Sequence, residues 1–134
     1  MAPVVLWHTL PNAPPAGTVV ARFDALADGV ALLVDLLPGD AQTPPERTAF
    51  RMLLLRSGPD VSAFANRCAH LGVPLAARQD QLMYKPHTSL TCNVHYARYR
   101  WSDGVCDRGD CLGERLIKIP VLVDNLGCIR VATD

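Results

Sequence analysis

Two short stretches decide how this chain folds: "CAHLGVPL" at residues 68–75 and "CNVHYARYRW" at residues 92–101. In each stretch a cysteine is followed at close range by a histidine, so that both side chains can reach one ion from a single tight loop. One such pair arises easily by chance, because a buried free cysteine is ordinary core filling. Two pairs in one segment predict a metal site.

The candidate ligands are Cys68, His70, Cys92 and His95. Thiolate and imidazole are the ligands of zinc and of iron–sulfur centres, and the absence of carboxylates from both pairs argues against calcium or magnesium. At this level the two kinds of centre remain alternatives.

Length and charge set limits on the function. The chain has 134 residues, enough for one domain with its own core, and its 13 basic residues balance 13 acidic ones. A neutral chain gives no reason to expect a nucleic acid or an anionic membrane as partner. The most apolar run, at residues 30–40, is interrupted by Asp35 and is shorter than the roughly 20 residues of a membrane span. The N-terminus shows no export signal, so we expect a cytoplasmic location, where thiols stay reduced.

Short apolar runs separated by Pro and Gly predict an all-β chain, and no helical period is sustained over three turns. The "SGPD" turn at residues 57–60 predicts a β-hairpin. Between the early and late strands we expect one long irregular segment, of the kind that is usually functional. The expected strands cover residues 3–7, 18–24, 30–36, 51–56, 61–65, 115–124 and 127–133, and the irregular segment covers about 66–112.

The two Cys/His stretches resemble the cluster-binding loops of the Rieske family, whose pattern is C-x-H followed by C-x-x-H. The resemblance implies one Rieske-type 2Fe–2S cluster per chain, with two cysteines on one iron and two histidines on the other. It also implies a single Rieske domain over residues 1–134. Its antiparallel β-sandwich base would use strands of about 1–65 and 113–134, and its smaller cluster-binding subdomain of two loops would cover about 66–112.

The second stretch departs from the family's usual Cys-Pro-x-His-Gly, with Asn93 in place of the proline and Tyr96 in place of the glycine. Glycine often supplies a positive φ there, which a tyrosine adopts only at a cost. The connection at residues 77–91 is longer than is usual in the family, which suggests an extended hairpin beside the cluster. Val73 and Val94 stand where high-potential members carry a disulfide, so the pattern is ferredoxin-like.

Two positions after the second loop bear on the reduction potential. High-potential members place a serine and a tyrosine there as hydrogen-bond donors to the sulfurs; this chain has Ala97 and Tyr99. Tyr99 is therefore a candidate for tuning the potential, with an aromatic packed beneath the loop as the alternative. We expect a potential at the low end of the Rieske range.

The resemblance implies an electron carrier, not an enzyme, that passes electrons from a reductase to a terminal oxygenase or another redox enzyme. Alternatives are the small Rieske-like subunit of a reductase such as nitrite reductase, and a structural zinc module. Cys106 and Cys111 could form a disulfide or a redox pair, but a reducing cytosol favours free thiols. Basic residues near the site form either a solvated face or a surface that steers an acidic partner; they are Arg67, Arg78, Lys85, Arg98 and Arg100.

Overall fold

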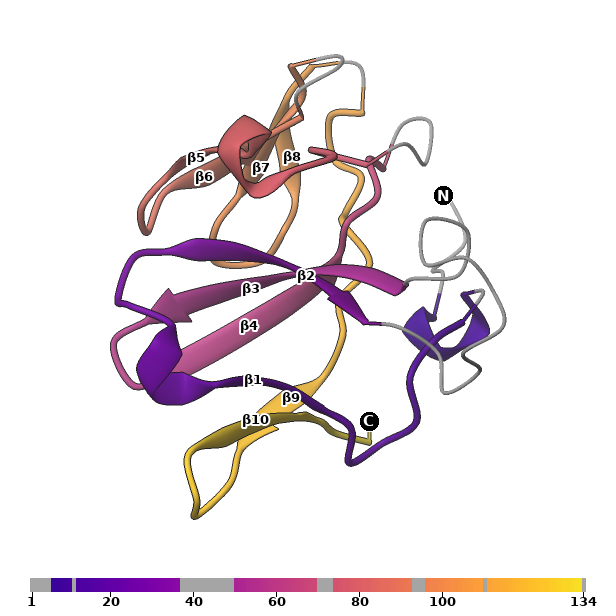
Figure 1. Cartoon of the computed structure of the whole chain (residues 1–134). Coiled ribbons are helices and arrows are strands. Elements are labelled where there is room, and N and C mark those ends of the chain that lie inside the picture. Colours follow the sequence, from indigo (N-terminus) through magenta and orange to yellow (C-terminus); the bar gives the residue numbers. More distant parts are fainter. Residues whose placement is uncertain are drawn as a thin grey trace.

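The computed structural model describes residues 6–10, 12–36, 50–69, 74–92, 96–109 and 111–133, and these residues form an all-β fold. Three antiparallel sheets are stacked, with the central sheet between the other two (Figure 1). The central sheet is β2 (Ala31–Leu36), β3 (Phe50–Ser57) and β4 (Asp60–Ala65). One outer sheet is β1 (Val19–Arg22), β10 (Cys128–Val131) and β9 (Val121–Val123). The other is β5 (Met83–Lys85), β6 (Ser89–Thr91), β7 (Arg98–Arg100) and β8 (Cys106–Arg108).

Both faces of the central sheet are buried, and this explains the unbroken apolar run in β3. Successive side chains of a strand point to opposite faces. Leu53 and Leu55 accordingly join the core beneath the β5–β8 sheet, while Met52 and Leu54 join the core toward β1, β9 and β10. All four are at most 1% exposed. When both faces of a strand are buried, apolar residues do not alternate with polar ones along it, so its sequence is a continuous hydrophobic run.

The predicted hairpin over residues 51–65 is confirmed: β3 pairs antiparallel with β4, from Met52 opposite Ala65 to Ser57 opposite Asp60. The predicted extended hairpin in residues 77–91 is also present, as β5 and β6. The all-β sandwich class is thereby confirmed, and the division into base and cluster-binding subdomain stays a prediction.

Three strand predictions need correction. Trp7 opens a short 3₁₀ helix, η1 (Trp7–Thr9), instead of ending a strand, and residues 3–5 lie outside the described ranges. Phe23 begins a second 3₁₀ turn, η2 (Phe23–Ala25), which shortens the strand predicted over 18–24. Of residues 115–124, only Val121–Val123 form a strand. The preceding part runs from the β5–β8 sheet to the central sheet, with isolated bridges from Arg115 to Val105 and from Lys118 to Phe64.

The long segment expected to be irregular contains the four-stranded β5–β8 sheet and a third 3₁₀ turn, η3 (Gln79–Gln81). Gly104 adopts a φ of +73° where the chain turns from β7 toward β8, and a Cβ there would lie 2.7 Å from a ring carbon of Phe64. Among the described residues, no helix is long and apolar enough to cross a membrane.

Candidate functional site

The two predicted cysteine ligands are buried in the same core, between the central sheet and the β5–β8 sheet. Cys68 follows β4 and is 2% exposed, and Cys92 follows β6 and is fully buried. His70 and His95 lie outside the described residues, as do Asn93, Val73 and Val94. The histidine positions therefore stay predictions.

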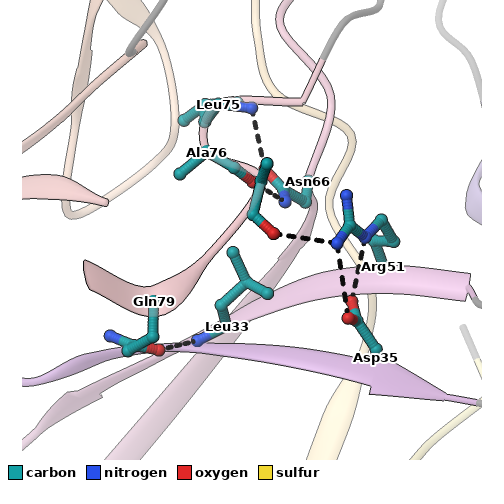
Figure 2. Close-up of polar contacts among 8 residues, drawn as sticks. Leu33, Asp35, Arg51, Asn66, Leu75, Ala76 and Gln79 are labelled. Atoms are coloured by element: carbon teal, nitrogen blue, oxygen red, sulfur yellow. Dashed lines mark hydrogen bonds and ion pairs between the residues drawn. The ribbon is translucent and has the colours of Figure 1, made fainter. Parts of the chain in front are cut away.

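Asn66 joins the two ends of the first Cys/His stretch (Figure 2). Its side-chain amide donates to the carbonyl of Ala76 at 2.8 Å, and its Oδ1 accepts from the backbone N–H of Leu75 at 2.8 Å. Asn66 is 1% exposed, so both bonds are shielded from water and costly to break. Asn66, which precedes the first stretch, is thereby hydrogen-bonded to Leu75 and Ala76 at its far end. Asn66 was not among the residues predicted from the sequence, although an amide at a strand end just before a candidate ligand is a usable signal.

The segment after this stretch is anchored on the central sheet (Figure 2). Arg51 on β3 donates to the carbonyl of Ala77 at 2.9 Å while it pairs with Asp35 on β2 at 3.1 Å. Gln79 accepts from the backbone N–H of Leu33 at 2.7 Å, so its side chain continues the hydrogen bonding of β2. These contacts hold the chain that leaves the first stretch against the central sheet.

The second stretch keeps a positive φ at Tyr96, where the family usually has glycine. Tyr96 has a φ of +59°, in the left-handed region where a residue other than glycine costs about 1–2 kcal/mol. Its N–H donates to the carbonyl of Cys92 at 2.9 Å, and the N–H of Cys92 donates to the carbonyl of Ala97 at 2.8 Å. Both backbone polar groups of Cys92 are thus hydrogen-bonded within the second stretch. The Tyr96 side chain is 67% exposed and contributes little to the core.

Tyr99 brings a hydroxyl to one of the candidate ligands. It lies on β7 and is fully buried, and its Oη is 3.2 Å from the Sγ of Cys68. The same oxygen accepts from the N–H of Ala69 at 3.0 Å and lies 3.3 Å from the Sγ of Cys111. Burial, followed by the hydrogen bonds with Cys111 and Cys68, raises the pKa of Tyr99 far above its ordinary value. The group is therefore a hydroxyl that can donate to a thiolate.

The chain of contacts continues beyond Tyr99 to two further cysteines. The Sγ atoms of Cys111 and Cys106 are 2.8 Å apart, and the Cys106 thiol also reaches the carbonyl of Arg108 at 3.3 Å. Burial, followed by the hydrogen bond with Cys106, raises the pKa of the Cys111 thiol to about 12. Cys106 and Cys111 are free thiols, as the sequence favoured, but their contact with Tyr99 was missed because it depends on pairing between strands.

Three of the basic residues near the site are locally neutralised, since each guanidinium lies within 3.3 Å of an aspartate carboxylate. The pairs are Arg78 with Asp80, Arg98 with Asp107, and Arg100 with Asp103. For these three arginines the structure favours a solvated, paired face over a surface that steers an acidic partner.

One match to a protein-family model covers both Cys/His stretches, Tyr99, Cys106 and Cys111. Residues 25–124 match the Rieske [2Fe-2S] domain. The chain belongs to the Rieske family. Its cofactor is a Rieske-type 2Fe–2S cluster, as the sequence predicted. The buried thiols of Cys68 and Cys92 suit the cysteine-bound half of such a cluster, and the Tyr99 hydroxyl lies 3.2 Å from the Cys68 sulfur.

Solved structures share the fold of this Rieske chain. The ferredoxin of carbazole 1,9a-dioxygenase from Nocardioides aromaticivorans IC177 superposes with a TM-score of 0.61 at 22% identity, covering 90% of this chain and 100% of that one. The terminal oxygenase of carbazole 1,9a-dioxygenase from Novosphingobium sp. KA1 gives a TM-score of 0.65 at 23% identity, over 89% of this chain and 30% of that one. A chain from a complex of carbazole-bound oxygenase with ferredoxin matches 87% of this chain, which covers 28% of that one, at 22% identity and a TM-score of 0.64. No curated protein matches the sequence.

Proposed function

We propose that this protein is a one-electron carrier that takes electrons from a reductase and delivers them to a terminal oxygenase or a similar redox enzyme. The observation that carries the proposal is the match to a ferredoxin of a dioxygenase system along the whole of that ferredoxin's length. In the oxygenase chains, by contrast, the shared fold is less than a third of the chain.

We assign the cluster ligands as Cys68 and Cys92 on one iron and His70 and His95 on the other. When bound, the cluster supplies a reversible one-electron couple, whose potential is raised when neutral imidazoles replace two thiolates. The burial of both cysteines supports this assignment, because it keeps water from the thiolate side.

The residues of the chain would hold this site rigid and set its electrostatics. Asn66 would fix the two ends of the first loop, and Arg51 would hold the following segment on the central sheet. Tyr99 would donate to the Cys68 sulfur and so favour the more negatively charged state. A rigid site suits a carrier, because little of its surroundings has to reorganise when charge changes.

We further propose a terminal oxygenase as acceptor, because similar folds occur in oxygenase–ferredoxin complexes. A reductase as donor and a cytoplasmic location complete the proposal. The free thiols of Cys106, Cys111 and Cys128 are in keeping with a reducing compartment.

The test is anaerobic purification of the full chain, followed by visible spectroscopy, EPR of the dithionite-reduced protein and stopped-flow reduction of cytochrome c. We expect visible absorption, an EPR signal with a low average g, and rapid transfer of one electron. Cys92→Ser should lose the absorption, whereas Cys128→Ser, in β10 outside the site, should retain it. A colourless protein with one bound zinc would refute the proposal.

A further inference from the structure

A chain of contacts through Cys111 and Tyr99 links Cys106 to Cys68. Cys106 and Cys111 lie outside the assigned cluster ligands, whereas Cys68 is one of them. Cys106 and Cys111 touch at 2.8 Å between their sulfurs, Cys111 lies 3.3 Å from the Tyr99 oxygen, and that oxygen lies 3.2 Å from the Cys68 sulfur. Cys106 is 1% exposed and Cys111 is 2% exposed. We propose that Cys106 and Cys111 form a dithiol–disulfide couple whose redox state alters the hydrogen bond that Tyr99 donates to Cys68.

The backbone brings these two thiols together and leaves room for the bond. Cys106 exchanges backbone hydrogen bonds with the far side of the turn: its N–H donates to Glu114 at 2.7 Å, and its carbonyl accepts from Gly113 at 2.9 Å. The two sulfurs need to approach by less than an ångström to reach the roughly 2.05 Å of a disulfide. Gly109 and Gly113, on either side of Cys111, both have positive φ values, a backbone conformation that residues with a Cβ rarely adopt.

Access for an oxidant is through the same turn. Both thiols are buried, so the reaction requires a local opening that exposes them, and Leu112, directly after Cys111, is already 70% exposed. The oxidant we assign is a low-molecular-weight disulfide. Once the turn has opened and the pair is exposed to water, one of its thiols gives its proton to solvent and attacks the small disulfide as a thiolate, releasing a small thiolate. The second cysteine then loses its proton, attacks the mixed disulfide and releases a second small thiolate, and the two released thiolates take up the two protons. In sum, two cysteine thiols and one small disulfide give the Cys106–Cys111 disulfide and two small thiols.

The two sulfurs near Tyr99 share its one hydrogen. Tyr99 Oη accepts the N–H of Ala69, so its own hydrogen goes to a sulfur. An iron-bound Cys68 has no hydrogen and must accept, and the Cys111 thiol donates to Cys106, so its sulfur faces Tyr99 as a second acceptor. A disulfide draws the Cys111 sulfur toward Cys106 and so changes its competition with Cys68 for the Tyr99 hydrogen. Oxidation of the pair therefore alters the bond to Cys68 and shifts the midpoint potential.

This role deepens the electron-carrier function proposed above and rests on it. The experiment equilibrates the cluster-loaded protein, without oxygen, in glutathione buffers of graded ratio. Free thiols are then alkylated and mapped by peptide mass spectrometry, and the midpoint potential is read by protein-film voltammetry. We expect Cys106 and Cys111 to become linked while Cys128 stays alkylated, together with a shift of the potential away from its value in the dithiol form.

Variants separate the two steps. In Tyr99→Phe the disulfide should still form but the potential should no longer respond to it, and in Cys111→Ser both responses should disappear. Two free thiols in the most oxidising buffer would overturn the proposal, and so would a disulfide that leaves the wild-type potential unchanged. Absence of a 2Fe–2S spectrum would instead refute the proposed function, and the thiol mapping would still report whether the pair forms.

Discussion

Tyr99→Phe tests whether the buried hydroxyl sets the potential of this Rieske protein. The substitution keeps the ring, which is fully buried, and removes the oxygen 3.2 Å from the Cys68 sulfur. A hydrogen bond to a charged acceptor contributes about 1.5–3 kcal/mol. Only the part that strengthens when the site gains negative charge affects the potential, and we take this part as about 1 kcal/mol. For a one-electron couple, 59 mV corresponds to a tenfold change or about 1.4 kcal/mol, so the potential should fall by roughly 40 mV.

The same substitution should also lower stability, because the N–H of Ala69 loses its acceptor at 3.0 Å. A buried donor left without a partner costs about 1–3 kcal/mol, which denaturant unfolding can measure. Tyr84→Phe, on β5 in the same sheet, is the matched control and should leave the potential unchanged. If Tyr99→Phe destabilises the protein but leaves its potential at the wild-type value, the hydroxyl is only a structural partner of Ala69 and the tuning role is wrong.

Three further substitutions test the backbone and the charges. Gly104→Ala should lower the unfolding free energy more than Gly58→Ala does. Both glycines have a positive φ, but only at Gly104 would the new Cβ lie 2.7 Å from a ring carbon of buried Phe64. Equal losses in urea melts would contradict this. Tyr96→Gly should raise the unfolding free energy by up to about 1 kcal/mol, whereas Tyr96→Ala, which keeps the φ penalty, should not. The hydrogen bond from Arg130, followed by those from backbone amides, lowers the pKa of Asp124 below its ordinary value of 3.8. Ionised Asp124 therefore stabilises the folded protein above pH 3.8, and this stabilisation is lost as the pH falls through the pKa of Asp124 in the folded state. In Asp124→Asn the unfolding free energy, measured by urea melts between neutral and acid pH, should therefore fall less steeply at low pH than in the wild type. An unchanged pH dependence would show that the ion pair with Arg130 contributes nothing to stability.

The strands that the sequence predicted well are those with long apolar runs. β3 is eight residues and its partners in the central sheet are six residues each, so their hydrophobic pattern and the Gly-Pro turn were sufficient. Each strand of the β5–β8 sheet has only three residues. A three-residue strand shows barely one alternation, and its identity depends on pairing with neighbours that only the folded chain supplies.

The candidate ligands could be predicted from short sequence patterns, but the residues that hold them in place could not. A cysteine and a histidine two or three positions apart are a local pattern, whereas the contacts that hold the site join residues distant in sequence. Tyr99 and Cys68 are 31 positions apart, and Arg51 and Ala77 are 26 apart. Such pairs are fixed by strand pairing and by the packing of sheets, neither of which leaves a trace in one sequence.

The stretch "ARYRW" nevertheless held one further piece of the answer. Alternate residues of β7 and its ends are buried (Ala97, Tyr99 and Trp101), while Arg100 is exposed and Arg98 is partly exposed. Period-two alternation therefore predicts that Tyr99 points inward. Tyr99 lies opposite both Leu90 on β6 and Cys106 on β8, so its hydroxyl is positioned by the sheet that also carries the cysteine pair. Because strands place this hydroxyl, we expect substitutions in the two Cys/His stretches outside β6 and β7 to leave its contact with the Cys68 sulfur in place.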